Sequence, residues 1–175
     1  QTSSATSGYQ SVVLGDGPSG YYKLDEPNGT VMFDSSGNVR NGTYTNAPTL
    51  GTPPLIGAQT AGNVGTSVTF NAALNQNGLC GAGTWPAVEP PNLSVEAWIK
   101  TTMNPGVAGF IVNSDNGGGD KYFSLSLRPG GLIRCDFYDN IGTQYTKVSG
   151  GAFNDGLPHH LVSTFDAANN IILYI

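Results

Sequence analysis

Short segments in which apolar and polar residues alternate recur along most of the chain. The clearest is segment 93–100, one face of which carries Leu93, Val95, Ala97 and Ile99. Its other face carries Ser94, Glu96, Trp98 and Lys100. Successive side chains of a β-strand point to opposite sides of a sheet, so this period of two predicts a strand with one buried face.

A second pair of alternating segments is separated by a short turn. Segment 122–128 is followed by Pro129-Gly130-Gly131, a combination typical of turns, and then by segment 132–138. One face of segment 132–138 carries Ile133, Cys135 and Phe137. The opposite face carries Leu132, Arg134, Asp136 and Tyr138. The pattern predicts a hairpin with an apolar side and a polar side.

Further strands are expected at segments 9–14, 21–25, 43–45, 67–71, 108–113, 143–149, 159–166 and 171–175. No segment has a convincing helical period, and the 25 Gly and 11 Pro punctuate the alternating runs. The missing helices exclude a parallel α/β architecture, and the lack of a fixed repeat disfavours a propeller or β-helix. The sequence therefore predicts an all-β fold, a sandwich of two antiparallel sheets.

Charged residues are scarce, at 11% of the chain, and the formal net charge is −5. Such a surface must be built from Ser, Thr, Asn and Gly, which is typical of secreted β-proteins and virion proteins. The seven Lys and Arg are scattered, so we expect no nucleic-acid binding. No apolar run approaches the roughly 18 residues of a membrane span, so we expect no membrane insertion.

The two cysteines permit one bridge. Cys135 lies in an alternating segment and Cys80 in the Gly-rich segment 78–83. We expect a Cys80–Cys135 disulfide, because the composition indicates an oxidising compartment and closing so long a loop would stabilise the fold by about 4 kcal/mol. The alternative is two separate buried thiols, which behave as small apolar side chains.

Polar and aromatic residues on the outward faces of the predicted strands are candidates for ligand binding. Glu96 and Trp98 face outward if segment 93–100 turns its apolar side inward, and Arg134, Asp136 and Tyr138 lie on the polar side of the hairpin. A planar ring and charged hydrogen-bonding groups on one curved sheet suit a sugar. The alternative is a Trp folded under a loop beside a surface ion pair of little energetic weight.

Two Gly-rich loops carry oxygen ligands that a calcium ion accepts. One loop contains Asp34 and Asn38, and the other contains Asp115 and Asp120. They make a structural calcium ion the one candidate cofactor that the sequence offers. The alternative is that these side chains cap their own backbone, as Asp and Asn usually do in such turns.

Six segments, in order, resemble the laminin-G-like family of concanavalin-A-like lectins and glucanases. They are VVLGDGPSGYYKLDE (12–26), DSSGN with NGTY (34–38 and 41–44), SVTFN (67–71), LSVEAWIK (93–100), NDGLPHHLVSTFD (154–166) and ILYI (172–175). The resemblance implies a jelly-roll of two curved sheets over residues 9–175, preceded by a flexible segment or linker at 1–8. The family usually continues with a turn and closing strands, so we expect this sequence to be cut from a longer chain and to lack its last strand or strands.

Members of this family bind glycans, glycosaminoglycans or proteins, and their relatives include glycoside hydrolases. The resemblance therefore implies a secreted, virion or cell-surface module that recognises an extracellular glycan or protein. The first alternative is a structural or decoration domain that contacts neighbouring subunits of a virion or surface assembly. A glycoside hydrolase-related enzyme is the third possibility, because fold membership does not choose a function.

Catalysis is disfavoured by the distribution of carboxylates. The glucanase relatives place a Glu-x-Asp-x-x-Glu pattern on one strand, and the residues around Glu96 lack it. The other glutamates are Glu26 and Glu89, and no pattern brings Asp136 close to Glu96. A glycosidase needs two carboxyl groups that flank one bond, so we expect no catalytic residues.

Overall fold

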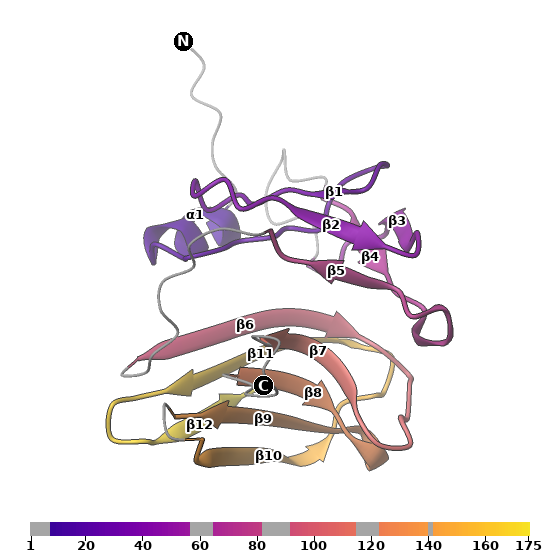
Figure 1. Cartoon of the computed structure of the whole chain (residues 1–175). Coiled ribbons are helices and arrows are strands. Elements are labelled where there is room, and N and C mark those ends of the chain that lie inside the picture. Colours follow the sequence, from indigo (N-terminus) through magenta and orange to yellow (C-terminus); the bar gives the residue numbers. More distant parts are fainter. Residues whose placement is uncertain (1–7, 57–64, 82–91, 115–122, 140–141) are drawn as a thin grey trace. The chain divides into compact units, whose positions relative to one another are not determined.

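The computed structural model describes residues 8–56, 65–81, 92–114, 123–139 and 142–175. The chain forms two compact units, Gln1–Pro86 and Ala87–Ile175, which are coloured from indigo to magenta and from pink to yellow in Figure 1. Both units are built mainly from antiparallel strands, which confirms the predicted all-β class. That residues 9–175 fold as one domain stays a prediction, and the predicted linker at 1–8 lies almost entirely outside the described residues.

The first unit contains a three-stranded sheet and a separate strand pair. The sheet has the order β1-β2-β5, and the pair joins β3 to β4. The bounds are α1 (Gly8–Gly15), β1 (Val31–Met32), β2 (Gly42–Thr45), β3 (Thr49–Thr52), β4 (Ser67–Thr69), the short 3-10 helix η1 (Ala72–Leu74) and β5 (Asn77–Leu79). Among the described residues of this unit, the buried large apolar side chains are those of Met32 and Tyr44. Met32 packs where any side chain at Gly42 or Gly78 would stand, so these two positions need glycine.

The second unit contains two sheets, with the orders β10-β9-β8-β7 and β12-β11-β6. The bounds are β6 (Leu93–Lys100), β7 (Gly109–Ser114), β8 (Phe123–Leu127), η2 (Pro129–Gly131), β9 (Leu132–Tyr138), β10 (Gln144–Ala152), β11 (Pro158–Phe165) and β12 (Ile171–Tyr174). The sequence prediction is confirmed for β6 and β9 at both ends. The hairpin of β8 and β9 also forms as predicted, around Gly130 and Gly131, which both have positive φ.

The two sheets of the second unit share one apolar core, which makes this unit a β-sandwich. The four-stranded sheet contributes Leu125, Leu127, Ile133, Cys135 and Phe137. The three-stranded sheet contributes Leu161 and Phe165, with Leu93, Ala97 and Ile99 packed against them. The rings of Phe137 and Phe165 stack across the two sheets, with centroids 5.1 Å apart and planes 8° from parallel.

Two predicted strands are wrong, and both lie in the first unit. Segment 9–14 is part of helix α1. Periodicity cannot distinguish a helix from a strand in so short an apolar run, and this segment forms the local backbone hydrogen bonds of a helix. Segment 21–25 makes only an isolated bridge between Tyr22 and Asp34, because Leu24 has a φ of 56° and breaks the extended backbone.

Three strands of the first unit were not expected from the sequence. They are β1, which has two residues, and β3 and β5, which each contain a glycine. Glycine lowers the strand signal, and a two-residue strand is too short for alternation to be recognised. These strands form because they pair with strands distant in the sequence, and not because their residues prefer the extended conformation.

The contact between Phe137 and Phe165 predicts a large loss of stability on truncation. Phe137→Ala should lower the free energy of unfolding by about 3–5 kcal/mol, because it removes a fully buried ring and leaves a cavity between the sheets. Urea unfolding followed by circular dichroism measures this change. Val107→Ala is the control, because Val107 is 79% exposed and its truncation should cost less than about 0.5 kcal/mol. A similar loss in both variants would contradict the assigned core.

Candidate functional site

The outward face of β9 carries a cluster of polar residues on the side away from the core. Alternation along β9 turns Cys135 and Phe137 inward, so Arg134, Asp136 and Tyr138 point outward, as the sequence predicts. The register places Asp136 directly between Ser124 on β8 and Thr146 on β10. Asp136 thus stands at the centre of a row that runs across three strands.

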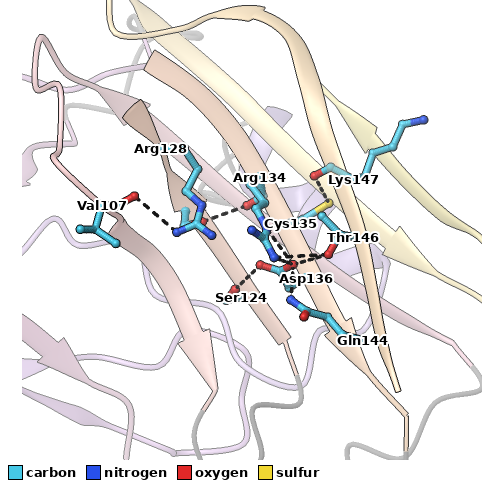
Figure 2. Close-up of polar contacts among 10 residues, drawn as sticks. Val107, Ser124, Arg128, Arg134, Cys135, Asp136, Gln144, Thr146 and Lys147 are labelled. Atoms are coloured by element: carbon cyan, nitrogen blue, oxygen red, sulfur yellow. Dashed lines mark hydrogen bonds and ion pairs between the residues drawn. The ribbon is translucent and has the colours of Figure 1, made fainter. Parts of the chain in front are cut away.

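Asp136 is the hub of this cluster, which Figure 2 shows. Its Oδ1 atom accepts hydrogen bonds from Gln144 Nε2 at 2.8 Å and from Thr146 Oγ1 at 2.6 Å. The same atom lies 2.9 Å from Arg134 Nε and 2.7 Å from Arg134 Nη2. Its Oδ2 atom accepts one long hydrogen bond, 3.4 Å, from Ser124 Oγ. Four side chains from three strands therefore converge on one carboxylate.

The hydrogen bonds to Asp136 offset its burial. Asp136 is 6% exposed, and burial by itself raises the pKa of a carboxyl group. The hydrogen bonds from Arg134, Thr146 and Gln144, together with the charge of Arg134, outweigh this effect and lower the pKa of Asp136 below its usual range. Asp136 is therefore ionised at neutral pH. Gln144 and Thr146, by contrast, are exposed on the strand at the edge of the sheet.

Glu96 and Trp98 lie on the other sheet, so the predicted five-residue face is divided in two. Their strand turns Val95 and Ala97 toward the core, and the outward side pairs Trp98 with His160 of β11. The indole and imidazole rings stack with centroids 4.7 Å apart, and His160 Nε2 lies 3.0 Å from Glu96 Oε1. The five residues were expected on one curved sheet, but they lie on two, because sheet membership is set by long-range pairing.

The division bears directly on glycoside hydrolysis. Asp136 and Glu96 point away from the shared core on opposite sheets of the sandwich, so they cannot flank the same bond. Within the described residues, the hydrogen-bond network of Asp136 contains no second carboxylate. The pair Asp136–Glu96 is therefore excluded as a catalytic pair.

The comparison with protein families matches residues 74–175, more than half of the chain. The matching model is of laminin-G type and is described as the concanavalin A-like lectin/glucanases superfamily. The chain belongs to this superfamily. The searches of the curated proteins and of the solved structures found no match to this chain. The matched range includes every strand of the sandwich and the whole Asp136 cluster.

Asp34, predicted as a calcium ligand, has other partners in this concanavalin A-like chain. Its Oδ1 accepts from the backbone N–H of Tyr21 at 3.0 Å and of Ser36 at 2.9 Å, and its Oδ2 accepts from that of Arg40 at 2.9 Å. Asn38 turns its amide nitrogen, a donor, toward Pro18 and Ser19 carbonyl oxygens. Asp34 and Asn38 thus hold a loop together through these hydrogen bonds, as Asp and Asn do in turns, and calcium binding by them stays a prediction.

The other predicted calcium ligands, Asp115 and Asp120, lie outside the described residues. Among the residues that the structure describes, no group of three His, Cys, Asp or Glu side chains is arranged to hold a metal ion. Calcium binding at the loop of Asp115 and Asp120 stays a prediction.

Both cysteines are free thiols in the structure, in place of the predicted disulfide. Cys135 is completely buried in the core of the sandwich, and its Sγ lies 3.8 Å from the carbonyl oxygen of Lys147. Burial raises the pKa of this thiol to about 11. Cys135 therefore packs as a small apolar side chain, as the alternative of two buried thiols expects for this cysteine but not for Cys80. Cys80 is exposed in the first unit.

Three residues of the Asp136 cluster were missed in the sequence: Ser124, Gln144 and Thr146. Ser124 lies on the polar side of the predicted hairpin, so a pairing of the two hairpin strands places it beside Asp136. Gln144 and Thr146 lie two apart in an alternating segment, which indicates a shared face. The sequence contains no signal for their register against β9, in which Gln144 pairs with Tyr138 and Thr146 with Asp136.

The contacts of Asp34 predict a dependence of stability on acid pH. Burial alone would raise its pKa, but the N–H groups of Tyr21, Ser36 and Arg40 and the hydroxyl of Ser36 lower it to about 2. A carboxyl group whose pKa is lowered by folding stabilises the fold at neutral pH, and this contribution is lost as the pH falls from about 4 toward 2.

The test compares melting temperatures of wild type and Asp34→Asn at pH 7, 4 and 2. The variant should melt well below wild type at pH 7, and the difference should shrink between pH 4 and pH 2. Asp16→Asn is the control, because the structure shows no side-chain hydrogen bond of Asp16 in the described part of the chain. A difference between wild type and Asp34→Asn that is constant from pH 7 to pH 2 would count against the assigned role.

Proposed function

We propose that this chain is a non-catalytic recognition module that binds an extracellular glycan through the outward face of β9 and β10. The observation that carries the proposal is the Asp136 cluster: one buried carboxylate holds three more accessible polar side chains in place. A binding site gains affinity when its polar groups are ordered before the ligand arrives. Arg134, Gln144 and Thr146 satisfy that condition.

An aromatic ring lies beside these polar groups. Tyr138 is two residues from Asp136 on β9, and its direct neighbour across the strands is Gln144. A sugar ring offers an apolar C–H face surrounded by hydroxyl groups, so a partly exposed tyrosine next to an amide and a guanidinium suits both parts of it. The combination supports a saccharide over a purely apolar ligand.

Membership of the superfamily supports binding as well, since its description names lectins beside glucanases. Laminin-G-like domains are typically not catalytic. A glucanase mechanism requires two carboxyl groups about 5–10 Å apart around the scissile bond. Asp136 instead accepts hydrogen bonds from four side chains, which offer an amide, two hydroxyls and a guanidinium. This chemistry supports binding rather than bond cleavage.

An extracellular location is part of the proposal, on a secreted protein, a virion or a cell surface. Laminin-G-like domains are usually extracellular. The surface is poor in charge, with 11% charged residues. In the described part of the chain, no helix has the length and apolar character needed to cross a membrane.

The proposal predicts that binding depends on Asp136. On an array of immobilised oligosaccharides, wild type should bind at least one glycan, and Asp136→Asn should bind it about tenfold more weakly, a loss of about 1.4 kcal/mol. The weakening is expected because asparagine cannot hold Arg134, Gln144 and Thr146 as an ionised carboxylate does. Glu96→Gln makes a matched acid-to-amide change on the other sheet and should bind as wild type does.

Several outcomes would decide against the proposal. If wild type and Asp136→Asn bind equally well, and circular dichroism shows both to be folded, the Asp136 cluster is not the binding site. Loss of binding in Glu96→Gln alone would move the site to the other sheet. Absence of glycan binding together with co-purification in a particle would favour the structural role, and release of reducing sugar from a polysaccharide would favour the enzyme.

A further inference from the structure

The chemistry of Asp136 determines where the hydrogen atoms of its neighbours lie. An ionised carboxylate has lone pairs and no hydrogen, so it can only accept hydrogen bonds. Each partner within hydrogen-bond distance must therefore turn a donor toward it. The rest of each partner then faces away from Asp136, toward whatever binds at the surface.

For Gln144 and Thr146, this requirement leaves acceptors free. Gln144 directs its NH₂ group at Asp136, so its Oε1 atom is the part turned away. Thr146 donates its single hydroxyl hydrogen to Asp136, so its remaining lone pair can only accept. Both residues are exposed on β10. Gln144 and Thr146 thus present two accessible oxygen acceptors, and their hydrogen bonds to Asp136 set the orientation of both.

For Arg134, the same requirement leaves donors free. Its Nε and Nη2 atoms face Asp136, and Nη2 is also 3.4 Å from Thr146 Oγ1. Within the described residues, Nη1 makes no hydrogen bond, and the side chain is 25% exposed. The two N–H donors on Nη1 therefore remain for a ligand.

A ligand that pairs with all three of these groups must therefore donate to two oxygens and accept from one guanidinium nitrogen. A hydroxyl group does both, whereas a sulfate or an ionised carboxylate can only accept. An anionic group placed here would meet the lone pairs of Gln144 and Thr146. We propose that the Asp136 cluster selects neutral, hydroxyl-rich saccharides and discriminates against sulfated or uronate-bearing ones.

The charge distribution supports the same selection. Arg134 is the cation that an acidic sugar would need, and it already forms an ion pair with Asp136 at 2.7 Å. An incoming anion would have to share that guanidinium with a buried carboxylate of its own sign. The chain as a whole carries a formal net charge of −5, which adds repulsion at low ionic strength.

The inference assigns separate roles to the residues of the cluster. Gln144 and Thr146 determine specificity, because they present acceptors to the ligand. Asp136 is a positioning residue that acts through them and through Arg134. The inference rests on the proposed function, because it concerns which glycan the same face takes.

The first experiment compares neutral oligosaccharides with their sulfated and uronate-bearing counterparts on one array, using the full chain. Binding should occur to neutral members and should weaken about tenfold or more on sulfation. It should change little between 50 and 500 mM NaCl, because no net charge is exchanged. A preference for the acidic counterparts would overturn the proposed selection of neutral saccharides but would still support glycan recognition. Absence of binding to every sugar would instead overturn the proposed function.

The second experiment removes one acceptor. Thr146→Val has nearly the same shape and lacks the hydroxyl, so neutral sugars should bind about tenfold more weakly, and Thr146→Ser should restore the binding. Thr164→Val is the matched control, because Thr164 lies on β11 in the other sheet. If Thr146→Val and Thr164→Val affect binding equally, Thr146 does not contact the ligand.

The third experiment tests the positioning role by a ratio of affinities. Asp136→Asn removes the buried charge and allows Gln144 to reverse its amide. The ratio of neutral to sulfated binding should fall, with the affinity for sulfated sugar unchanged or raised. A mere loss of folding lowers both affinities together and leaves the ratio constant, so a constant ratio would overturn this role.

Discussion

The stacked rings of Phe137 and Phe165 set the orientation of the strand on which the candidate site depends. Phe137 is inward because its ring meets Phe165 of the facing sheet at 5.1 Å. Since side chains alternate along a strand, Arg134 and Asp136 must then be outward. A slip of one residue would place a carboxylate in the apolar core, at a cost of several kcal/mol. The same strand alternation therefore fixes both the apolar core and the polar cluster.

A carboxylate that accepts several hydrogen bonds organises part of each unit: the partly buried Asp34 in the first and the buried Asp136 in the second. The difference lies in the donors that satisfy them. Asp34 accepts mainly from the backbone N–H groups of Tyr21, Ser36 and Arg40, so its hydrogen bonds hold a loop in place. Asp136 takes side chains whose other atoms remain accessible. The same physical interaction thus yields a structural loop in one unit and a candidate binding face in the other.

The candidate binding residues that the sequence pattern suggested for one face lie on the two opposite outward faces of the sandwich. Glu96 pairs with His160 beside Trp98, on the three-stranded sheet. Asp136 has its own partners on the four-stranded sheet. Because the apolar core lies between them, no ligand of ordinary size touches both. This separation is the physical reason that the Asp136 cluster supports recognition and that a paired-carboxylate mechanism with Glu96 is excluded.

The sequence by itself determined the all-β class, the strands at 93–100 and 132–138, and the outward position of Asp136, because alternation is a local property. It failed at segment 9–14, where a short apolar run suits a helix equally well. Only the tertiary structure decided that Thr146 and Gln144 are the partners of Asp136 and that Trp98 is not. Strand register and sheet membership depend on contacts between residues far apart in the chain, and no local pattern encodes them.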